Sequence, residues 1–196
     1  MSTHSTTFCL GALCGALALA VGGCRGGIID DKAEARLRAA IGNTTITVFP
    51  AFVRDGEQNR YEATAAKTIA DFLTEADLAT ATVSTAEVPI TSKWGMNQAK
   101  MFRGSATNFR EYVGRHPLET DYALLPEYLI LGRGAVGGVH VYLVDAEGTV
   151  AYASLFNSHH EEFNDVAPKT VDDCTTIVIN ALRADLGRDD RAGPAE

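Results

Sequence analysis

Charge is absent from the first 24 residues of this 196-residue chain, which contain no lysine, arginine, aspartate or glutamate. The 17 basic and 25 acidic side chains all lie after that segment and give a net charge of −8 at pH 7. Proteins that hold nucleic acids or anionic lipids by electrostatic attraction carry an excess of positive charge on the binding surface. The acidic balance therefore argues against nucleic acid as a partner and against electrostatic attachment to a membrane.

A second absence is that of any apolar run long enough to cross a bilayer, which takes about 20 residues. The longest run, Phe8–Val21, fits the apolar centre of an export signal peptide, although the segment before it carries His4 instead of a lysine or arginine. The following Val21-Gly22-Gly23-Cys24 resembles the bacterial lipobox. That resemblance implies cleavage before Cys24 and lipidation of its thiol.

Lipidation would determine where the protein is found. Several acyl chains on Cys24 would anchor the mature chain stably, whereas a single chain binds a membrane only marginally. We expect the protein in the bacterial cell envelope, with its domain in the periplasm, and the choice between inner and outer membrane stays open. Two alternatives also stay open: a cleaved secretory signal with an incidental cysteine, and a cytoplasmic protein with an apolar N-terminal segment.

Cysteine is scarce, with four in the chain. Cys9 and Cys14 would leave with the signal peptide and Cys24 would be lipidated, so only Cys174 would remain as a free thiol. The mature chain could then form no internal disulfide, and its core alone would stabilise it. We expect a signal peptide at 1–23, a lipidated cysteine and tether at 24–29, a single domain at 30–187 and a disordered tail at 188–196.

Common catalytic patterns are missing as well, since the chain contains neither G-x-S-x-G nor H-E-x-x-H. Cys174 falls on the apolar face of an amphipathic helix, where we expect a buried, unreactive thiol rather than a nucleophile. The sequence therefore favours a non-enzymatic protein without settling whether it is an enzyme.

What the sequence does contain is an alternation of helical and extended patterns. Thr170 and Asp173 have the spacing of a capping box at the start of the last helix. Pro126 interrupts an apolar strand, which indicates a bulge or an edge position. The predicted helices are 30–40, 61–78, 97–116 and 170–186, the predicted strands are 45–53, 81–84, 122–131, 138–144 and 150–156, and 157–169 is predicted to be a polar loop.

The order of these elements predicts an α/β (α+β) fold. A strand-helix-strand start implies a right-handed crossover and parallel pairing of the first two strands. The closely spaced last three strands imply an antiparallel meander. We therefore expect a mixed sheet of about five strands, covered by three to four packed helices.

This order resembles a group of envelope proteins: the amino-terminal domain of the translocation protein TolB, the lipoprotein activators of peptidoglycan synthases, and curli-secretion lipoproteins. The matching segments are ITVFP from Ile46, the helix at Ala65–Leu73, DYALLPEYL from Asp121 and VHVYLVDAEGTV from Val139. These are patterns of apolar residues over most of 45–186, so no functional residue is carried across. The resemblance implies a non-enzymatic envelope domain that binds another protein.

One local cluster contains side chains that bind metals. His159, His160 and Glu161 are consecutive, and His140 on the neighbouring predicted strand could supply a further ligand. Imidazole and carboxylate ligands suit zinc. Adjacent residues of an extended chain point to opposite sides, however, so both histidines could bind one ion only if the loop turned sharply. The alternative is a polar loop with no bound metal.

The loop at Thr91–Met96 contains Trp94, the only tryptophan of the chain. Exposed tryptophan is common at the centre of protein interfaces, so Trp94 and Met96 are candidates for partner binding. The alternative is that Trp94 is a core side chain folded under the loop.

Two hypotheses follow. The first is a lipid-anchored accessory domain that binds an envelope protein and uses no cofactor. The second is a metal-binding protein or metal-dependent hydrolase that uses the loop at His159, His160 and Glu161.

Overall fold

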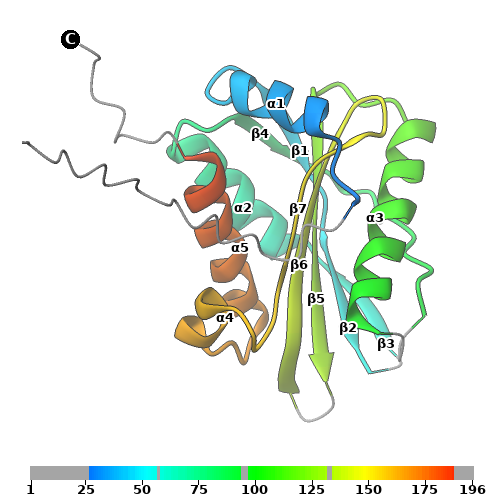
Figure 1. Ribbon diagram of the computed structural model, residues 1–196, viewed down its shortest axis with the longest axis vertical. Helices are drawn as coiled ribbons and strands as arrows, with labels where there is room; N and C mark the ends of the chain where they lie inside the picture. The colour runs from blue at the N-terminus through cyan, green and yellow to red at the C-terminus, as the bar shows by residue number, and fades with distance from the viewer. Residues whose placement is uncertain (1–26, 57, 94–96, 132–133, 188–196) are drawn as a thin grey trace, which may run out of the picture.

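The computed structural model describes residues 27–56, 58–93, 97–131 and 134–187, which form a mixed seven-stranded sheet with helices packed around it (Figure 1). The predicted α/β class is confirmed, with seven strands where about five were expected. The elements are α1 (Asp31–Ala40), β1 (Thr45–Val48), β2 (Ala51–Asp55), β3 (Gln58–Glu62), α2 (Ala63–Glu75), β4 (Thr80–Val83), α3 (Gln98–Arg115), β5 (Tyr122–Leu131), β6 (Ala135–Asp145), β7 (Val150–Phe156), α4 (Glu161–Val166) and α5 (Val171–Leu186).

Strand β5 lies at the centre of the sheet. Along one side its first half pairs in parallel with β1 and its second half with β2, and along the other side it pairs antiparallel with β6. Strand β4 lies outside β1, β3 lies outside β2, and β7 lies outside β6. The predicted parallel pairing is thus found between β1 and β4, and the predicted meander is β5, β6 and β7.

The segment predicted as one strand at 45–53 is two strands, because Phe49 and Pro50 interrupt it. This break also explains how a proline, Pro126, can lie inside the central strand β5. Leu124 and Ile130 turn their carbonyl oxygens toward β1 and β2, where they accept from the N–H groups of Phe49 and Gly56. Pro126, two residues after Leu124, therefore faces the interruption, where its missing N–H breaks no ladder bond.

The prediction of a bulge or edge position at Pro126 was therefore wrong. The residue lies in the central strand, and the irregularity of the ladder falls between Leu129 and Ile130. A proline is tolerated at this position because the neighbouring chain is broken at the same level.

Helix ends follow the local sequence. Thr170 accepts from the N–H of Asp173, whose side chain accepts from the N–H of Thr170, so the predicted capping box is present. Asn97 caps α3 by accepting from the N–H of Ala99. Two elements differ from the prediction: Tyr61 lies in β3, opposite Phe52, and the expected loop contains α4, whose Phe163 is buried in the core.

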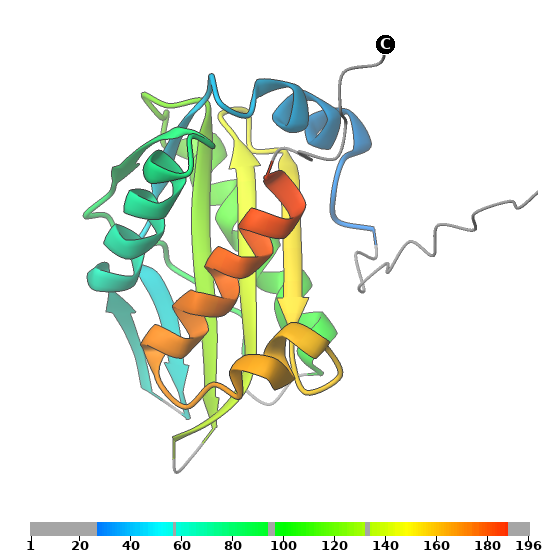
Figure 2. The same cartoon turned by 90° about the vertical axis from the view of Figure 1, so that its left-hand side faces the viewer.

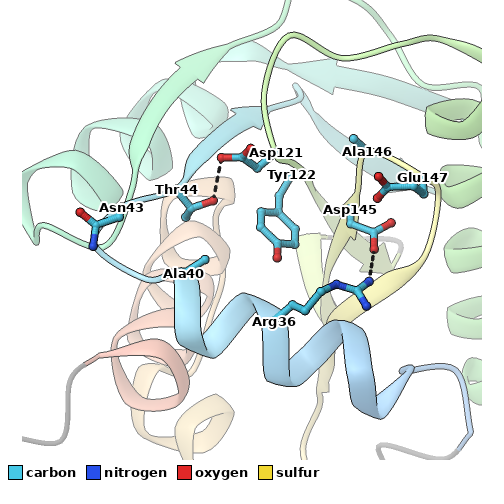
Figure 3. A pocket seen from close by; sticks show the side chains of 9 residues that line it. All are labelled: Arg36, Ala40, Asn43, Thr44, Asp121, Tyr122, Asp145, Ala146 and Glu147. Carbon is cyan, nitrogen blue, oxygen red and sulfur yellow. Dashed lines mark hydrogen bonds and ion pairs between the residues drawn. The ribbon is translucent and has the colours of Figure 1, made fainter.

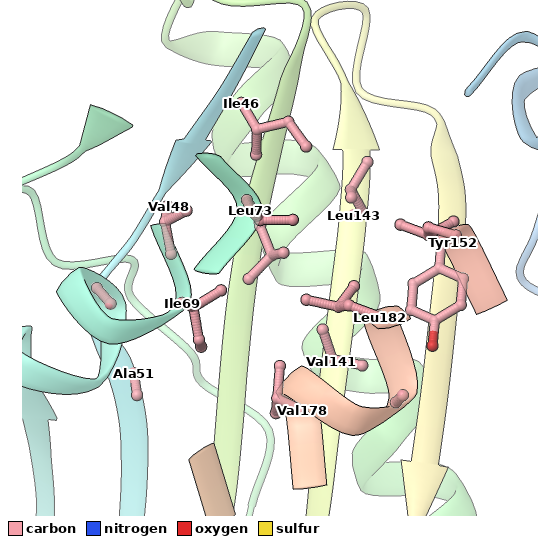
Figure 4. Close-up of a cluster of buried hydrophobic side chains, with 14 of the residues drawn as sticks. Ile46, Val48, Ala51, Ile69, Leu73, Val141, Leu143, Tyr152, Val178 and Leu182 are labelled. Atoms are coloured by element: carbon pink, nitrogen blue, oxygen red, sulfur yellow. The ribbon is translucent and has the colours of Figure 1, made fainter. Parts of the chain in front are cut away.

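Helices cover both faces of the sheet, as Figures 1 and 2 show: α2, α4 and α5 on one face and α3 on the other, with α1 across one end. The core accordingly has two parts. The larger part includes Ile69, Leu73, Val178 and Leu182 from α2 and α5, packed on the sheet (Figure 4). The second part packs α3 onto the opposite face. Because β5 is covered on both sides, nearly all of its residues are buried.

Cys174 lies in the larger core cluster and is 0% exposed. Burial raises the pKa of its thiol to about 12, so it stays protonated at neutral pH. The expectation of a buried thiol is confirmed. Among the described helices, none combines the length and hydrophobicity that crossing a membrane requires.

Candidate binding site

The described fold begins close to the predicted lipidation site. Ile28 and Ile29 pack against the core cluster beneath α3. The N–H of Asp30 donates to the carbonyl oxygen of Val150 at 3.0 Å, and the Asp30 side chain caps α1 by accepting from the N–H of Ala33 at 2.9 Å. The chain is therefore held beside the start of β7 from residue 28 onward. Cys24 itself lies outside the described residues.

A cavity of about 400 Å³ opens between α1, the segment before β1, the start of β5 and the turn between β6 and β7 (Figure 3). We call it the α1 pocket. Its lining combines charged groups, a tyrosine and small side chains, and consists of Arg36, Ala40, Asn43, Thr44, Asp121, Tyr122, Asp145, Ala146 and Glu147.

Three of these side chains are carboxylates and one is a guanidinium. Arg36 pairs with Oδ2 of Asp145 at 2.9 Å, although the arginine side chain is 59% exposed and that of Asp145 only 6%. Oδ1 of Asp145 accepts from the N–H of Thr149 at 2.7 Å. Glu147 is exposed at the mouth of the pocket. The lining therefore carries more negative than positive charge.

Asp121 is held in the ionised state by the strand beside it. Its Oδ2 accepts from the N–H and the hydroxyl of Thr45, at 2.9 and 2.8 Å, and from the hydroxyl of Thr44 at 3.1 Å. The hydrogen bond from the Thr45 backbone is the main reason that the pKa of Asp121 is lowered. All three bonds use one oxygen, so Oδ1 is left without a bond to a described residue.

Tyr122 lies between these carboxylates, and Figure 3 shows its hydroxyl directed toward α1. The residue is only 5% exposed, yet its hydroxyl makes no hydrogen bond to any described residue. Burial raises the pKa of Tyr122, and the charges of Asp145, Asp121 and Glu147 act in the same direction, against the effect of Arg36. The hydroxyl is therefore neutral and is unpaired by any described group.

A second polar group lies inside the protein, on the α3 face of the sheet. Glu127 is 0% exposed, and its Oε1 accepts from Nε of Arg54 at 2.6 Å and from the hydroxyl of Ser105 at 3.0 Å. Its Oε2 accepts from the hydroxyl of Tyr142 at 2.8 Å and lies 2.9 Å from Nδ1 of His140. Both carboxylate oxygens are thus fully bonded.

The electrostatics of this buried network favour the ionised carboxylate. Burial opposes ionisation of Glu127, but the hydrogen bond and charge of His140 and the guanidinium of Arg54 outweigh it and lower the pKa from 4.5 to about 2. Arg54, itself 2% exposed, also donates to the carbonyl oxygen of Ser92 at 2.7 Å. The network thus ties β2, β5, β6 and α3 together.

His140 was predicted as a metal ligand, and the structure gives it other neighbours. Its Nδ1 is bonded to Glu127, and its ring lies edge-on to Phe102 with centroids 5.2 Å apart. Nε2 is buried and has no hydrogen-bond partner among the described residues. His140 does not line the α1 pocket.

The other candidate ligands lie after β7. His159 is exposed, and Nδ1 of His160 lies 3.2 Å from the N–H of Asn157, which donates to it. Glu161 is exposed in the first turn of α4. Over the described residues, no three His, Cys, Asp or Glu side chains are arranged so that they could hold a metal ion. The structure thus does not bring the predicted ligands together, and zinc binding itself stays an untested prediction.

The other site residues cannot be placed, since Trp94 and Met96 lie outside the described residues, as Cys24 does. The buried network and the α1 pocket were not predicted. Glu127 follows Pro126 inside an otherwise apolar strand. This position was a signal that a basic or hydrogen-bonding side chain had to be buried beside its carboxylate. No local pattern announced the pocket, whose lining comes from four separate segments.

Comparison with known proteins gives a likeness of fold only. No known protein family and no curated protein matches the chain. Among solved structures, the PelC dodecamer of Paraburkholderia phytofirmans has 14% sequence identity and a TM-score of 0.41, covering 76% of this chain and 91% of that one. The LpoB C-terminal domain from Escherichia coli has 13% identity and a TM-score of 0.33, covering 63% and 92%.

Lipoprotein GNA1162 from Neisseria meningitidis has 14% identity and a TM-score of 0.34, covering 74% of this chain and 98% of that one. The predicted weak, fold-level resemblance to envelope lipoproteins is confirmed. It transfers no functional residue.

Proposed function

We propose that this protein is a lipid-anchored accessory protein of the bacterial cell envelope, whose domain binds an envelope protein and catalyses no reaction itself. Its domain would face the periplasm, held to the membrane through acyl chains on Cys24. The lipobox-like Val21-Gly22-Gly23-Cys24 and the apolar Phe8–Val21 support the anchor.

The observation that carries the proposal is the short distance between the anchor and the fold. Ile28 is the fourth residue after Cys24 and already packs against the core. A fully extended chain spans about 3.5 Å per residue, so a lipid on Cys24 would be no more than about 14 Å from Ile28. A domain on so short a tether stays beside the membrane, where its partner must be reached.

The anchor can be tested directly. In cells, the Cys24→Ala variant should lose acylation of the mature N-terminus, measured by mass spectrometry, and should leave the membrane fraction. The matched control is Cys14→Ala, which alters a cysteine of the leader and should remain acylated and membrane-bound. A Cys24→Ala protein that stays in the membrane fraction would contradict the proposed anchor.

The partner can be tested in the same cells. A photo-crosslinking amino acid at position 147, beside the α1 pocket, should give a covalent adduct with an envelope protein. The adduct should be weaker when Cys24→Ala is combined with it, because the tether supplies the high local concentration. Equal adduct with and without Cys24 would show that binding does not depend on the anchor.

A further inference from the structure

We propose that the α1 pocket binds the positively charged end of a lysine or arginine side chain from the partner protein. This inference rests on the proposed binding function, but it does not depend on the lipid anchor. Two independent observations carry it: the excess of carboxylates in the lining, and the side chain of Tyr122, a residue only 5% exposed, which lines the pocket with a hydroxyl that bonds to no described residue.

The charges of the pocket select a cation. The lining contains three carboxylates, Asp121, Asp145 and Glu147, and a single guanidinium, that of Arg36, so its net negative charge favours a further cation. Arg36 holds Asp145 from a position that is 59% exposed, which shows that this carboxylate accepts a guanidinium at the pocket. Charge-assisted hydrogen bonds of this kind are about twice as strong as neutral ones.

The hydroxyl of Tyr122 adds a requirement for a hydrogen-bond donor. Ammonium and guanidinium groups carry only donors, and the oxygen of Tyr122 can accept one of them. Oδ1 of Asp121, which accepts no bond from a described residue, offers a further acceptor in the lining. A cation beside Tyr122 would therefore bond a hydroxyl that no described residue bonds.

The same lining disfavours other ligands. An anion would meet three carboxylates, and the ethanolamine head group of a phospholipid carries a phosphate next to its ammonium, which these carboxylates would repel. A lysine or arginine bears its charge at the end of an uncharged stem. No group of side chains suited to a metal ion is present in the described ranges.

The place of the pocket agrees with a partner at the membrane. Arg36 lies six residues after Asp30 along α1, a distance of about 9 Å at 1.5 Å per helical residue. The pocket is thus at the end of the fold where the chain enters from the anchor. A basic side chain near the membrane surface would be within its reach.

The test is a titration of the full-length protein, 15N-labelled and purified from membranes in a non-ionic detergent. N-acetylarginine amide and N-acetyllysine amide are the probes, N-acetylcitrulline amide is the uncharged isostere, and phosphoethanolamine represents the lipid head group. Backbone amide shifts around the pocket report binding. We expect saturable shifts with both basic probes, and affinity about tenfold lower for the citrulline compound.

Variants locate the effect. Tyr122→Phe, which removes only the hydroxyl, and Glu147→Gln, which neutralises an exposed carboxylate without disturbing the core, should each weaken binding by about threefold to tenfold. Glu162→Gln is the control. Glu162 is exposed on α4 and does not line the α1 pocket, so this change should leave the affinity for the probes unchanged.

Three results would overturn the inference: no saturable shift with either basic probe, equal binding of the citrulline compound, or affinities that Tyr122→Phe and Glu147→Gln leave unaltered. Binding of phosphoethanolamine as tight as that of the arginine probe would identify a lipid head group as the ligand instead. If the titration fails while the native protein is acylated at Cys24 and crosslinks to an envelope protein, the proposed function stands and this inference alone is rejected.

Discussion

Glu127 shows most clearly how single residues shape this protein. It is a buried carboxylate in the central strand, and four side chains donate to its two oxygens. Taking charges out of water is costly, so a buried ion pair is weak evidence of net stabilisation. Removing one partner is a different matter, because the remaining charge is left buried without compensation. If Glu127 were neutralised, the buried charge of Arg54 would lose its compensating carboxylate.

We therefore expect Glu127→Gln to lower the free energy of unfolding by about 3–5 kcal/mol, measured by urea denaturation. The variant keeps the shape of the side chain, removes the charge and replaces one accepting oxygen by an NH2 donor. Glu119→Gln is the matched control, since Glu119 is exposed, and it should change the value by less than about 0.5 kcal/mol. Equal effects of the two changes would show that the buried charge is unimportant.

The same carboxylate predicts how stability depends on pH. Its pKa is lowered from 4.5 to about 2 in the folded protein, so between these values the unfolded chain binds more protons than the folded one. The stabilisation by ionised Glu127 is complete above pH 4.5 and is lost as the pH falls through about 2.

As the pH is lowered from 4.5 to about 2, the free energy of unfolding should fall more steeply for the natural protein than for Glu127→Gln. Urea titrations at several pH values measure both slopes. The lowered pKa values of Asp121 and Asp173 affect the two proteins alike, so their difference reports Glu127. Parallel curves would contradict the prediction.

At the scale of the element, the sequence predicted best where a local signal was strong. The capping box at Thr170 and the continuous apolar run of β5 gave correct positions, because both depend on neighbours in the chain. Strand β3 and helix α4 were missed. The residues of β3 are mostly exposed and polar, so their composition does not indicate a strand. The strand forms because its backbone pairs with β2. Helix α4 is a single short stretch anchored by Phe163.

The segment that leads into α4 also carries the metal hypothesis. His160 is already bonded to Asn157, and His140 is bonded to Glu127 inside the protein. We therefore expect the purified full-length protein to contain no stoichiometric zinc, as measured by elemental analysis, and to melt at the same temperature in zinc and in EDTA.

The double variant His159→Ala/His160→Ala is the control for that measurement. It should match the natural protein in metal content and in its response to zinc. Near-stoichiometric metal that the double variant loses would instead support the metal-dependent function, and would call for tests of hydrolysis.

At the scale of the whole molecule, the fold joins its two proposed interaction sites. The chain enters beside β7, α1 follows at once, and the α1 pocket lies against that helix. A lipid anchor and a binding pocket would thus lie on the same part of the protein. Helix α4 lies at the opposite end of the fold from α1 (Figure 2).

The sequence alone determined the properties that depend on composition and on near neighbours. These are the uncharged segment that ends at Cys24, the α/β class, and the starts of the helices at Asn97 and Thr170. Such features need only the local chain, so they can be predicted from its pattern.

Only the tertiary structure decided which distant residues meet. Arg54 and Glu127 are 73 positions apart, and Arg36 and Asp145 are 109 apart. Whether such side chains come together depends on strand order and register, and a shift of one residue would turn each to the other face of the sheet. The buried network and the α1 pocket are products of that register, which no local pattern encodes.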